Sequence, residues 1–341
     1  MRMMIKIFSF IRAYVKSMRL YYSFITGIAG LIGVSYYQYL VYLKKGNVIA
    51  VTGSDVYSPT SLTKLILILI ILFLSWGVNQ IYNDYLGLKE DKINAPDRPM
   101  VSGELNPELA VLLSTIMMLA ALLITWFFLE KYAVIPLLLG ISLNFFYEYA
   151  KGHGMWGNII FGIMISMCSL FSFLASGKPD ISILTSGSVF FLLYISLLNG
   201  LMTFYTYFKD YEGDKAAGKK TLIVKLGLEN SQKLSVLTSF LPICTFLIIY
   251  YGFEVWNFEL NGIFILLGLI ATGLQLWTGY LFYKNPKGEM TYFSLGINFR
   301  SCACNETALI AVFNPALGVL LFLISFFFIG FLFNFHSNVR A

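Results

Sequence analysis

Long apolar runs, separated by short polar segments, occupy nearly the whole sequence. A helix that crosses a membrane needs about 20 consecutive, mostly apolar residues. The windows that meet this requirement are residues 20–42, 62–86, 108–129, 132–150, 157–177, 183–208, 232–252, 260–283 and 307–334. Because they leave little chain between them, we predict one all-α, polytopic membrane domain over residues 1–341, with about nine transmembrane helices around a central cavity that opens to the cytoplasmic side.

The composition excludes a soluble protein. Of the 341 residues, 58% are hydrophobic and 12% are charged, whereas about 25% are charged in an average soluble domain. The mean hydropathy is +0.74. The four cysteines lie in or near apolar runs with no histidine at ligand spacing, so neither a zinc site nor a disulfide framework is expected. We expect membrane lipid as the surroundings and no nucleic-acid partner.

Basic residues alternate between the two sides of the predicted bundle. They crowd the N-terminus and every second loop, where residues 89–98, 151, 209–225 and 284–300 lie. By the positive-inside rule, the N-terminus and these polar loops are cytoplasmic, and the C-terminus lies outside. The segment 1–19 has the pattern of a basic amphipathic helix at the membrane interface. A basic flank that only orients the first span fits that pattern equally well.

Two acidic clusters of similar design end two of the predicted spans on the cytoplasmic side. They consist of Asn79, Asn83, Asp84, Glu90 and Asp91 after the second span, and of Asp210, Glu212 and Asp214 after the sixth. A helix turns about 100° per residue, so a helix continued through the first cluster places its polar side chains from position 83 onward within an arc of roughly 120°. The two aspartates of the second cluster are one turn apart. Two helix ends therefore present pairs of carboxylates to one cavity.

A cation would resolve the repulsion between two such pairs. Carboxylates at membrane depth usually face a cavity or a partner, and like charges at close range repel. Mg²⁺ typically binds one or two carboxylates together with phosphate oxygens and water. The nearby basic residues exceed what the acids need; they are Lys92, Arg98, Lys151, Lys215, Lys219 and Lys220. A solvated, salt-bridged helix end would explain one cluster alone, but two matching clusters favour a site for Mg²⁺ and a diphosphate.

Three ordered motifs resemble those of the UbiA superfamily of intramembrane prenyltransferases. The family pattern NDxxDxxxD, followed by an RPxxSG-type loop, is matched by Asn83-Asp84-x-x-Gly87-x-x-x-Asp91 and residues 98–103. The pattern DxxxD, followed by GxxTL, is matched by residues 210–214 and 218–222. The pattern YxxxK is matched by Tyr147 and Lys151. The resemblance covers essentially the whole chain.

This resemblance implies Mg²⁺ as the cofactor and an isoprenyl diphosphate as the substrate. The catalytic carboxylates would be Asp84, Asp91, Asp210 and Asp214, and these four would bind metal together with Asn83. The side chains in contact with the diphosphate would be Arg98, Tyr147, Lys151 and Lys215. The loops at 92–106 and 215–230 would close over the substrate as cytoplasmic caps. Ionisation of an allylic diphosphate creates a carbocation and a polyanion, which metal ions and basic side chains stabilise while the cavity excludes water.

Gly87 departs from the family pattern, because transferases of the family usually have the middle aspartate there. The form Asn83-x-x-x-Gly87-x-x-x-Asp91 resembles the terpene-cyclase branch, so our main expectation is intramolecular cyclisation of the carbocation. The alternative is a prenyltransferase for an aromatic or other lipophilic acceptor, in which Glu90 or Asp84 replaces the lost carboxylate. A third is a non-catalytic membrane protein or a transporter, against which the intact second motif argues.

Overall fold

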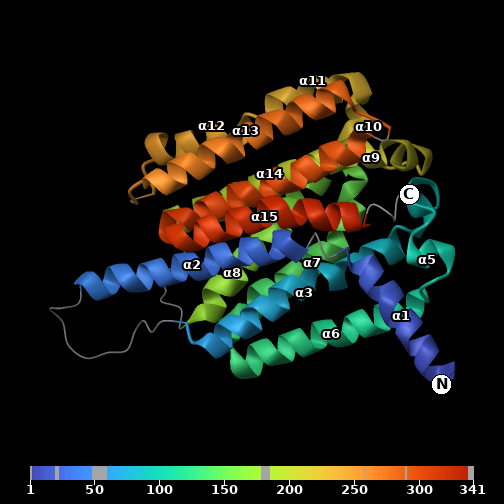
Figure 1. The fold of residues 1–341 in the computed structure, drawn as a ribbon, viewed down its shortest axis with the longest axis horizontal. Coiled ribbons are helices and arrows are strands. Elements are labelled where there is room, and N and C mark those ends of the chain that lie inside the picture. Colours follow the sequence, from blue (N-terminus) through green and yellow to red (C-terminus); the bar gives the residue numbers. More distant parts are fainter. Residues whose placement is uncertain are drawn as a thin grey trace.

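Figure 1 shows the fold in the computed structural model, which describes residues 2–19, 23–47, 60–177, 185–256, 258–288 and 290–336. Most helices lie roughly side by side along the long axis of the molecule. The helices of this bundle are α2 Ser23–Asn47, α3 Leu62–Leu86, α6 Pro107–Phe128, α7 Val134–Lys151, α8 Trp156–Ser176, α9 Ser186–Ala216, α11 Leu228–Thr238, α12 Leu241–Leu247, α13 Gly262–Lys284, α14 Met290–Phe313 and α15 Pro315–His336. The other elements are α1 Arg2–Met18, α4 Leu88–Asn94, α5 Pro99–Ser102, a 3₁₀ turn Lys131–Ala133, β1 His153–Gly154, β2 Lys220–Thr221, α10 Leu222–Leu226 and a π-helical turn Ile248–Gly252.

Nine helical segments in the described part of the chain are long and apolar enough to cross a membrane, which confirms the predicted fold class. Residues 20–22 and 183–184, at the start of two predicted windows, lie outside the described residues. On α6 the exposed leucine and isoleucine side chains recur every three to four residues, as expected of a face toward lipid. They are Leu109, Leu112, Ile116, Leu119 and Leu123.

Polar N-cap residues fix where several of these helices begin. The side chains of Ser61, Asn106, Thr185 and Asn261 each accept a hydrogen bond from the backbone N–H three residues later. Such a bond satisfies one of the donors that the first turn of a helix leaves without a partner. The apolar runs therefore become helices with starts that the adjacent polar residues define.

The last predicted window, residues 307–334, needs correction. The structure divides it at Asn314 into the end of α14 and the start of α15, and the two helices pack antiparallel against each other (Figure 1). The Asn314 side chain accepts a hydrogen bond from the Leu317 N–H at 3.1 Å, and Pro315 begins the new helix. The free ends of α1 and α15 therefore lie at the same end of the molecule, so the prediction of termini on opposite sides is wrong.

Small residues let the central helices approach closely. α8 packs against α2, α7 and α9, while α14, which is almost entirely buried, packs against α2, α9, α13 and α15. The hydroxyls of Ser169 and Ser172 on α8 donate to the carbonyls of Ala29 and Gly30 on α2, each at 2.5 Å. A Cβ atom at Gly33 would lie 2.0 Å from the Ser169 carbonyl oxygen. Contacts of this kind are typical of helix pairs in membranes.

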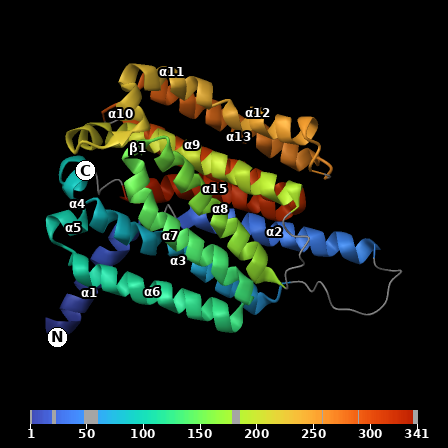
Figure 2. The same ribbon diagram turned by 180° about the vertical axis from the view of Figure 1, so that it is seen from behind.

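The short elements α4, α5, β1, β2 and α10 lie at the end of the bundle where α3, α7 and α9 all have polar ends (Figure 2). β1 pairs in parallel with β2, with His153 opposite Lys220. This pairing holds the segment that follows α7 beside the segment that follows α9. α9 itself extends to Ala216, beyond the predicted end of the sixth span, so the second acidic cluster lies on its last turns.

Candidate active site

A polar pocket lies at this end of the bundle. Its wall takes side chains from α3, α4, α7, α8 and α9 and from the segments next to them. All the predicted site residues line it except Asp214 and Lys215. The structure thus brings the three sequence motifs, which are far apart along the chain, to one place.

The first acidic cluster keeps a shared face despite a break at Gly87. α3 ends at Leu86 and α4 begins at Leu88, but the hydrogen bonds run on from the Gly87 N–H to the Asn83 carbonyl at 2.8 Å and from the Asp91 N–H to the Gly87 carbonyl at 3.0 Å. This helical spacing turns Asn83 and Asp91 toward the same pocket. The predicted juxtaposition within this cluster is confirmed.

Arginine side chains neutralise this cluster. Arg19 Nη2 lies 2.5 Å from Asp84 Oδ1, and Arg98 Nη1 lies 3.5 Å from the same oxygen and also pairs with Asp91. Gln80 Nε2 donates to Asp84 Oδ1 at 2.8 Å. Asp84 is only 2% exposed, and its Oδ2 accepts no hydrogen bond from the described residues. Burial raises the pKa of the Asp91 carboxyl above its ordinary value, although the adjacent Arg98 acts in the opposite direction.

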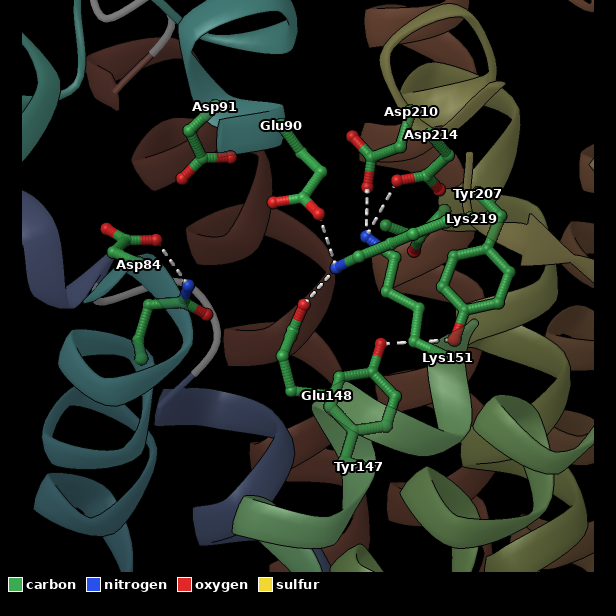
Figure 3. A network of polar contacts seen from close by, with 12 residues as sticks. Asp84, Glu90, Asp91, Tyr147, Glu148, Lys151, Tyr207, Asp210, Asp214 and Lys219 are labelled. Atoms are coloured by element: carbon green, nitrogen blue, oxygen red, sulfur yellow. Dashed lines mark hydrogen bonds and ion pairs between the residues drawn. The ribbon is translucent and has the colours of Figure 1, made fainter. Parts of the chain in front are cut away.

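Lys151 bridges the second acidic cluster, as Figure 3 shows. Its Nζ lies 3.5 Å from Asp210 Oδ2 and 3.4 Å from Asp214 Oδ1. Asp210 lines the pocket. Asp214 is fully buried and is no part of the pocket wall, so it reaches the pocket through Lys151. The lysine of the third motif therefore holds both carboxylates of the second.

Two buried tyrosines support Lys151 from the other side. The Tyr207 hydroxyl donates to the Tyr147 hydroxyl at 3.2 Å, and the Lys151 ammonium lies 5.5 Å from the centre of the Tyr207 ring. Tyr147 and Lys151 share a face of α7 because they are one turn apart. Tyr207 was not predicted, since an aromatic residue in an apolar run is usually a packing residue.

Lys219 connects two sides of the pocket. Its Nζ lies 3.1 Å from Glu90 Oε1 on α4 and forms a second ion pair with Glu148 on α7 (Figure 3). The side chains of Lys219, Glu90 and Glu148 are 16%, 13% and 14% exposed. Lys219 directly precedes β2, and the pairing of β1 with β2 places it beside the end of α7. Glu148 had no signal in the sequence beyond its place inside the third motif.

Two expectations about basic residues change with the structure. Lys215 is exposed, with its ammonium 5.6 Å from the centre of the Tyr211 ring, and it lies outside the pocket wall. The structure therefore does not support its predicted contact with the diphosphate. It directly follows Asp214 on α9, and a step of one residue turns the side chain about 100° away. Arg19, expected only at the interface or as an orienting flank, lines the pocket instead because α1 packs against α3 and α5.

The oxygen atoms of the pocket suit Mg²⁺ in kind. Within the residues that the structure describes, no three acidic, histidine or cysteine side chains already converge on one point. Arginine and lysine side chains hold the carboxylates instead. Asn83 Oδ1 and Asp84 Oδ2 are buried and accept no hydrogen bond from the described residues. Carboxylate and amide oxygens are the donors that Mg²⁺ prefers, so these residues fit the implied ion.

An apolar pocket adjoins the polar one. Trp76 lines both pockets, and the apolar pocket continues between α3, α6, α7 and α8 past Ile71, Leu137 and Met164. A charged pocket and an apolar pocket therefore meet at Trp76. This combination suits an amphiphile with an anionic head and an apolar chain.

Comparisons with known proteins agree with this arrangement. The model of the UbiA prenyltransferase family matches residues 46–301. The digeranylgeranylglyceryl phosphate synthase of Thermococcus sibiricus is 29% identical over 232 residues, which are 67% of this chain and 76% of that protein.

Solved structures show the same fold. A structure described for digeranylgeranylglyceryl phosphate synthase in membranes has a TM-score of 0.58 at 20% identity, covering 89% of this chain and 99% of the other. A UbiA homolog from Archaeoglobus fulgidus bound to DMAPP and Mg²⁺ has a TM-score of 0.56 at 15% identity, covering 87% of this chain and 99% of the other.

Proposed function

The chain belongs to the UbiA prenyltransferase family, and from this premise we propose that it transfers an isoprenyl group from a diphosphate donor to a lipophilic acceptor within the membrane. One observation carries the proposal. Asp84 and Asp91 on one side and Asp210 on the other line a single pocket, and Asp214 contacts it through Lys151. Arginine and lysine charges already neutralise both pairs.

The comparisons favour transfer over cyclisation. The expected cyclase rested on Gly87 alone, and the relatives do not support it. The relative from Thermococcus sibiricus is named for a product that carries two geranylgeranyl groups on a glyceryl phosphate. We therefore propose a prenylated glycerol phosphate as the acceptor class, with a geranylgeranyl diphosphate as the donor.

The basic side chains of the pocket have a defined task in this reaction. When bound, Mg²⁺ supplies positive charge for the diphosphate oxygens, and Asn83, Asp84, Asp91 and Asp210 are the residues that would hold it. Arg19, Arg98 and Lys151 would add charge-assisted hydrogen bonds to the same oxygens. Transition-state stabilisation of this electrostatic kind is commonly the largest contribution to catalysis.

The apolar pocket would take the donor chain. The allylic carbon–oxygen bond breaks with its electron pair leaving on the diphosphate, and the positive charge on the prenyl group then faces Trp76 and Phe161, whose ring centres are 5.4 Å apart. The acceptor hydroxyl forms a new oxygen–carbon bond at the allylic carbon and releases its proton to the departed diphosphate. Apolar walls keep water from capturing the cation.

The polar pocket would open to the cytoplasm. The Lys and Arg residues concentrate at the same end of the bundle as the pocket, as the positive-inside rule requires of a cytoplasmic face. The segments 92–106 and 215–230 contribute Arg98 and Lys219 to the pocket, which supports their proposed role as caps.

Product analysis tests the proposal. The full chain in lipid nanodiscs is incubated with Mg²⁺ and geranylgeranyl diphosphate under three conditions. The added acceptor is geranylgeranylglyceryl phosphate in the first and a hydroxylated aromatic acid in the second, and the third contains no acceptor. We expect a doubly prenylated glycerol phosphate that is absent from an Asp91→Ala control. A cyclic hydrocarbon or alcohol formed without acceptor would return the assignment to a cyclase. Intact diphosphate under all three conditions would overturn both.

A further inference from the structure

Two glutamates border position 87, where the first motif lacks a carboxylate. The Gly87 backbone has φ −92° and ψ 13°, a conformation open to any L-residue. A Cβ atom there would meet the Asn83 carbonyl oxygen at 3.0 Å, Glu90 Oε2 at 3.9 Å and Glu148 Oε1 at 4.0 Å. The backbone dihedral angles do not require glycine, but a side chain here would have to displace the Asn83 carbonyl slightly. The carboxylates of Glu90 and Glu148 border the space beside this position.

These two carboxylates already share one cation. Glu90 comes from α4 and Glu148 from α7, and both pair with the ammonium of Lys219 (Figure 3). All three side chains line the pocket in which Asp84 has a buried oxygen that accepts no hydrogen bond from the described residues. Two mostly buried carboxylates this close need a positive charge between them, and here a lysine supplies it.

We propose that Glu148, together with Glu90, supplies to the Mg²⁺ and diphosphate site the carboxylate that position 87 lacks, and that Lys219 occupies this pair until the metal and donor bind. The inference rests on the proposed function and deepens it. With metal and diphosphate bound, the oxygens of Glu148 and Glu90 would hold the divalent ion, and the Lys219 ammonium would contact the phosphate oxygens. Each charge then keeps an opposite partner. A first motif with glycine at its middle position remains compatible with a transferase.

Three variants separate this role from that of a structural ion pair. The probe is Mn²⁺ in place of Mg²⁺. Bound ion is measured by equilibrium dialysis without diphosphate, for the full chain in nanodiscs, so that a contact between Lys219 and phosphate does not affect the result. Glu148→Gln should weaken Mn²⁺ binding by about tenfold or more, the loss that is usual when a metal site loses a supporting carboxylate. Gly87→Asp placed in the Glu148→Gln background should restore most of that loss. Lys219→Gln removes the same ion pair but leaves both carboxylates, so it should bind Mn²⁺ as tightly as the unaltered protein or more tightly.

The Mn²⁺ affinities of these variants distinguish a metal-binding role of Glu148 from a structural one. Equal losses in Glu148→Gln and Lys219→Gln would mean that the pair only ties α7 to α4, and would overturn the inference. Wild-type affinity in Glu148→Gln would overturn it as well. An unaltered protein that binds no Mn²⁺ would instead remove the proposed function itself. Elution of each variant as a folded particle in size-exclusion chromatography shows that reduced binding reflects the site.

Discussion

Arg19 and Asp84, 65 positions apart in the sequence, are joined by an ion pair of 2.5 Å between Nη2 and Oδ1. Through this contact the segment that precedes the first membrane helix becomes part of the pocket. Asp84 is nearly fully buried, so the arginine neutralises a carboxylate that would otherwise be costly to bury.

Replacement of Arg19 should therefore weaken donor binding. A hydrogen bond to a charged group contributes about 1.5–3 kcal/mol, so Arg19→Gln should raise the KM for the isoprenyl diphosphate by about tenfold or more. The matched control is Arg12→Gln on the same segment, because Arg12 is exposed and lies outside the pocket wall. Steady-state assays of diphosphate release give both values. Equal KM values for the two variants would show that Arg19 only shields Asp84.

Removal of a metal-site carboxylate should abolish turnover. We expect Asp91→Ala and Asp210→Ala to reduce product formation by about 100-fold or more while leaving expression in membranes intact. Glu212→Ala is the control, since Glu212 lies on the same stretch of α9 but is exposed. Chelation of Mg²⁺ by EDTA should have the same effect as the two aspartate variants and should be reversed by added Mg²⁺. Retained activity in both aspartate variants would exclude the metal site as assigned.

Lys151 and Lys215 should behave differently although both are basic residues close to Asp214. Lys151 contacts two carboxylates inside the pocket, whereas Lys215 is exposed beside Tyr211. Lys151→Gln should lower kcat/KM by about tenfold or more, because it removes the positive charge that stabilises the diphosphate leaving group. Lys215→Gln should leave kcat/KM within about twofold of the unaltered enzyme. A large loss in Lys215→Gln would mean that this side chain moves into the pocket during turnover.

The loss of metal binding at low pH should follow the protonation of the Asp91 carboxylate. A carboxyl group must be ionised to bind Mg²⁺, and burial raises the pKa of Asp91. Bound Mn²⁺ should therefore fall, as the pH is lowered, at a pH above the ordinary aspartate value of about 3.9. Dialysis across a pH series measures this midpoint. The exposed Asp97 serves as the control, since Asp97→Asn should leave the curve unchanged.

A buried polar contact in the bundle centre should matter for stability. Glu306 on α14 is fully buried and its Oε1 accepts a hydrogen bond from Asn199 Nδ2 on α9 at 2.7 Å. Glu306→Gln keeps an acceptor, whereas Glu306→Leu leaves the Asn199 N–H without this partner, at a cost of about 1–3 kcal/mol. The leucine variant should melt at a lower temperature than the glutamine variant in thermal unfolding. Identical melting temperatures would show that this contact adds no stability.

Local sequence patterns predicted most of the bundle and much of the pocket. Apolar windows predict membrane helices because the thickness of the membrane sets the length of a spanning helix. Helical spacing alone predicted that Asn83 and Asp91 lie on one face. The windows failed at Asn314, because an average over about 20 residues conceals a cap signal of two residues. The sequence also did not reveal that Gly87 would border two glutamates.

The residues that were missed depend on tertiary packing. Arg19 reaches Asp84 only because α1 packs on α3, and Lys219 meets Glu148 only because β1 pairs with β2. Hydropathy and motif spacing contain no information about such contacts. Lys215 was predicted to contact the diphosphate and is adjacent to Asp214 along the chain, but the helix turns its side chain away from the pocket.

The helix break at Asn314 also determines how the protein can be labelled. Because α15 returns antiparallel to α14, residues 2 and 336 end on one side of the bundle. Reporter tags fused at either terminus should therefore give the same signal in a protease-protection or compartment-specific fluorescence assay. A tag inserted at the opposite end of the bundle, between α12 and α13, should give the reverse.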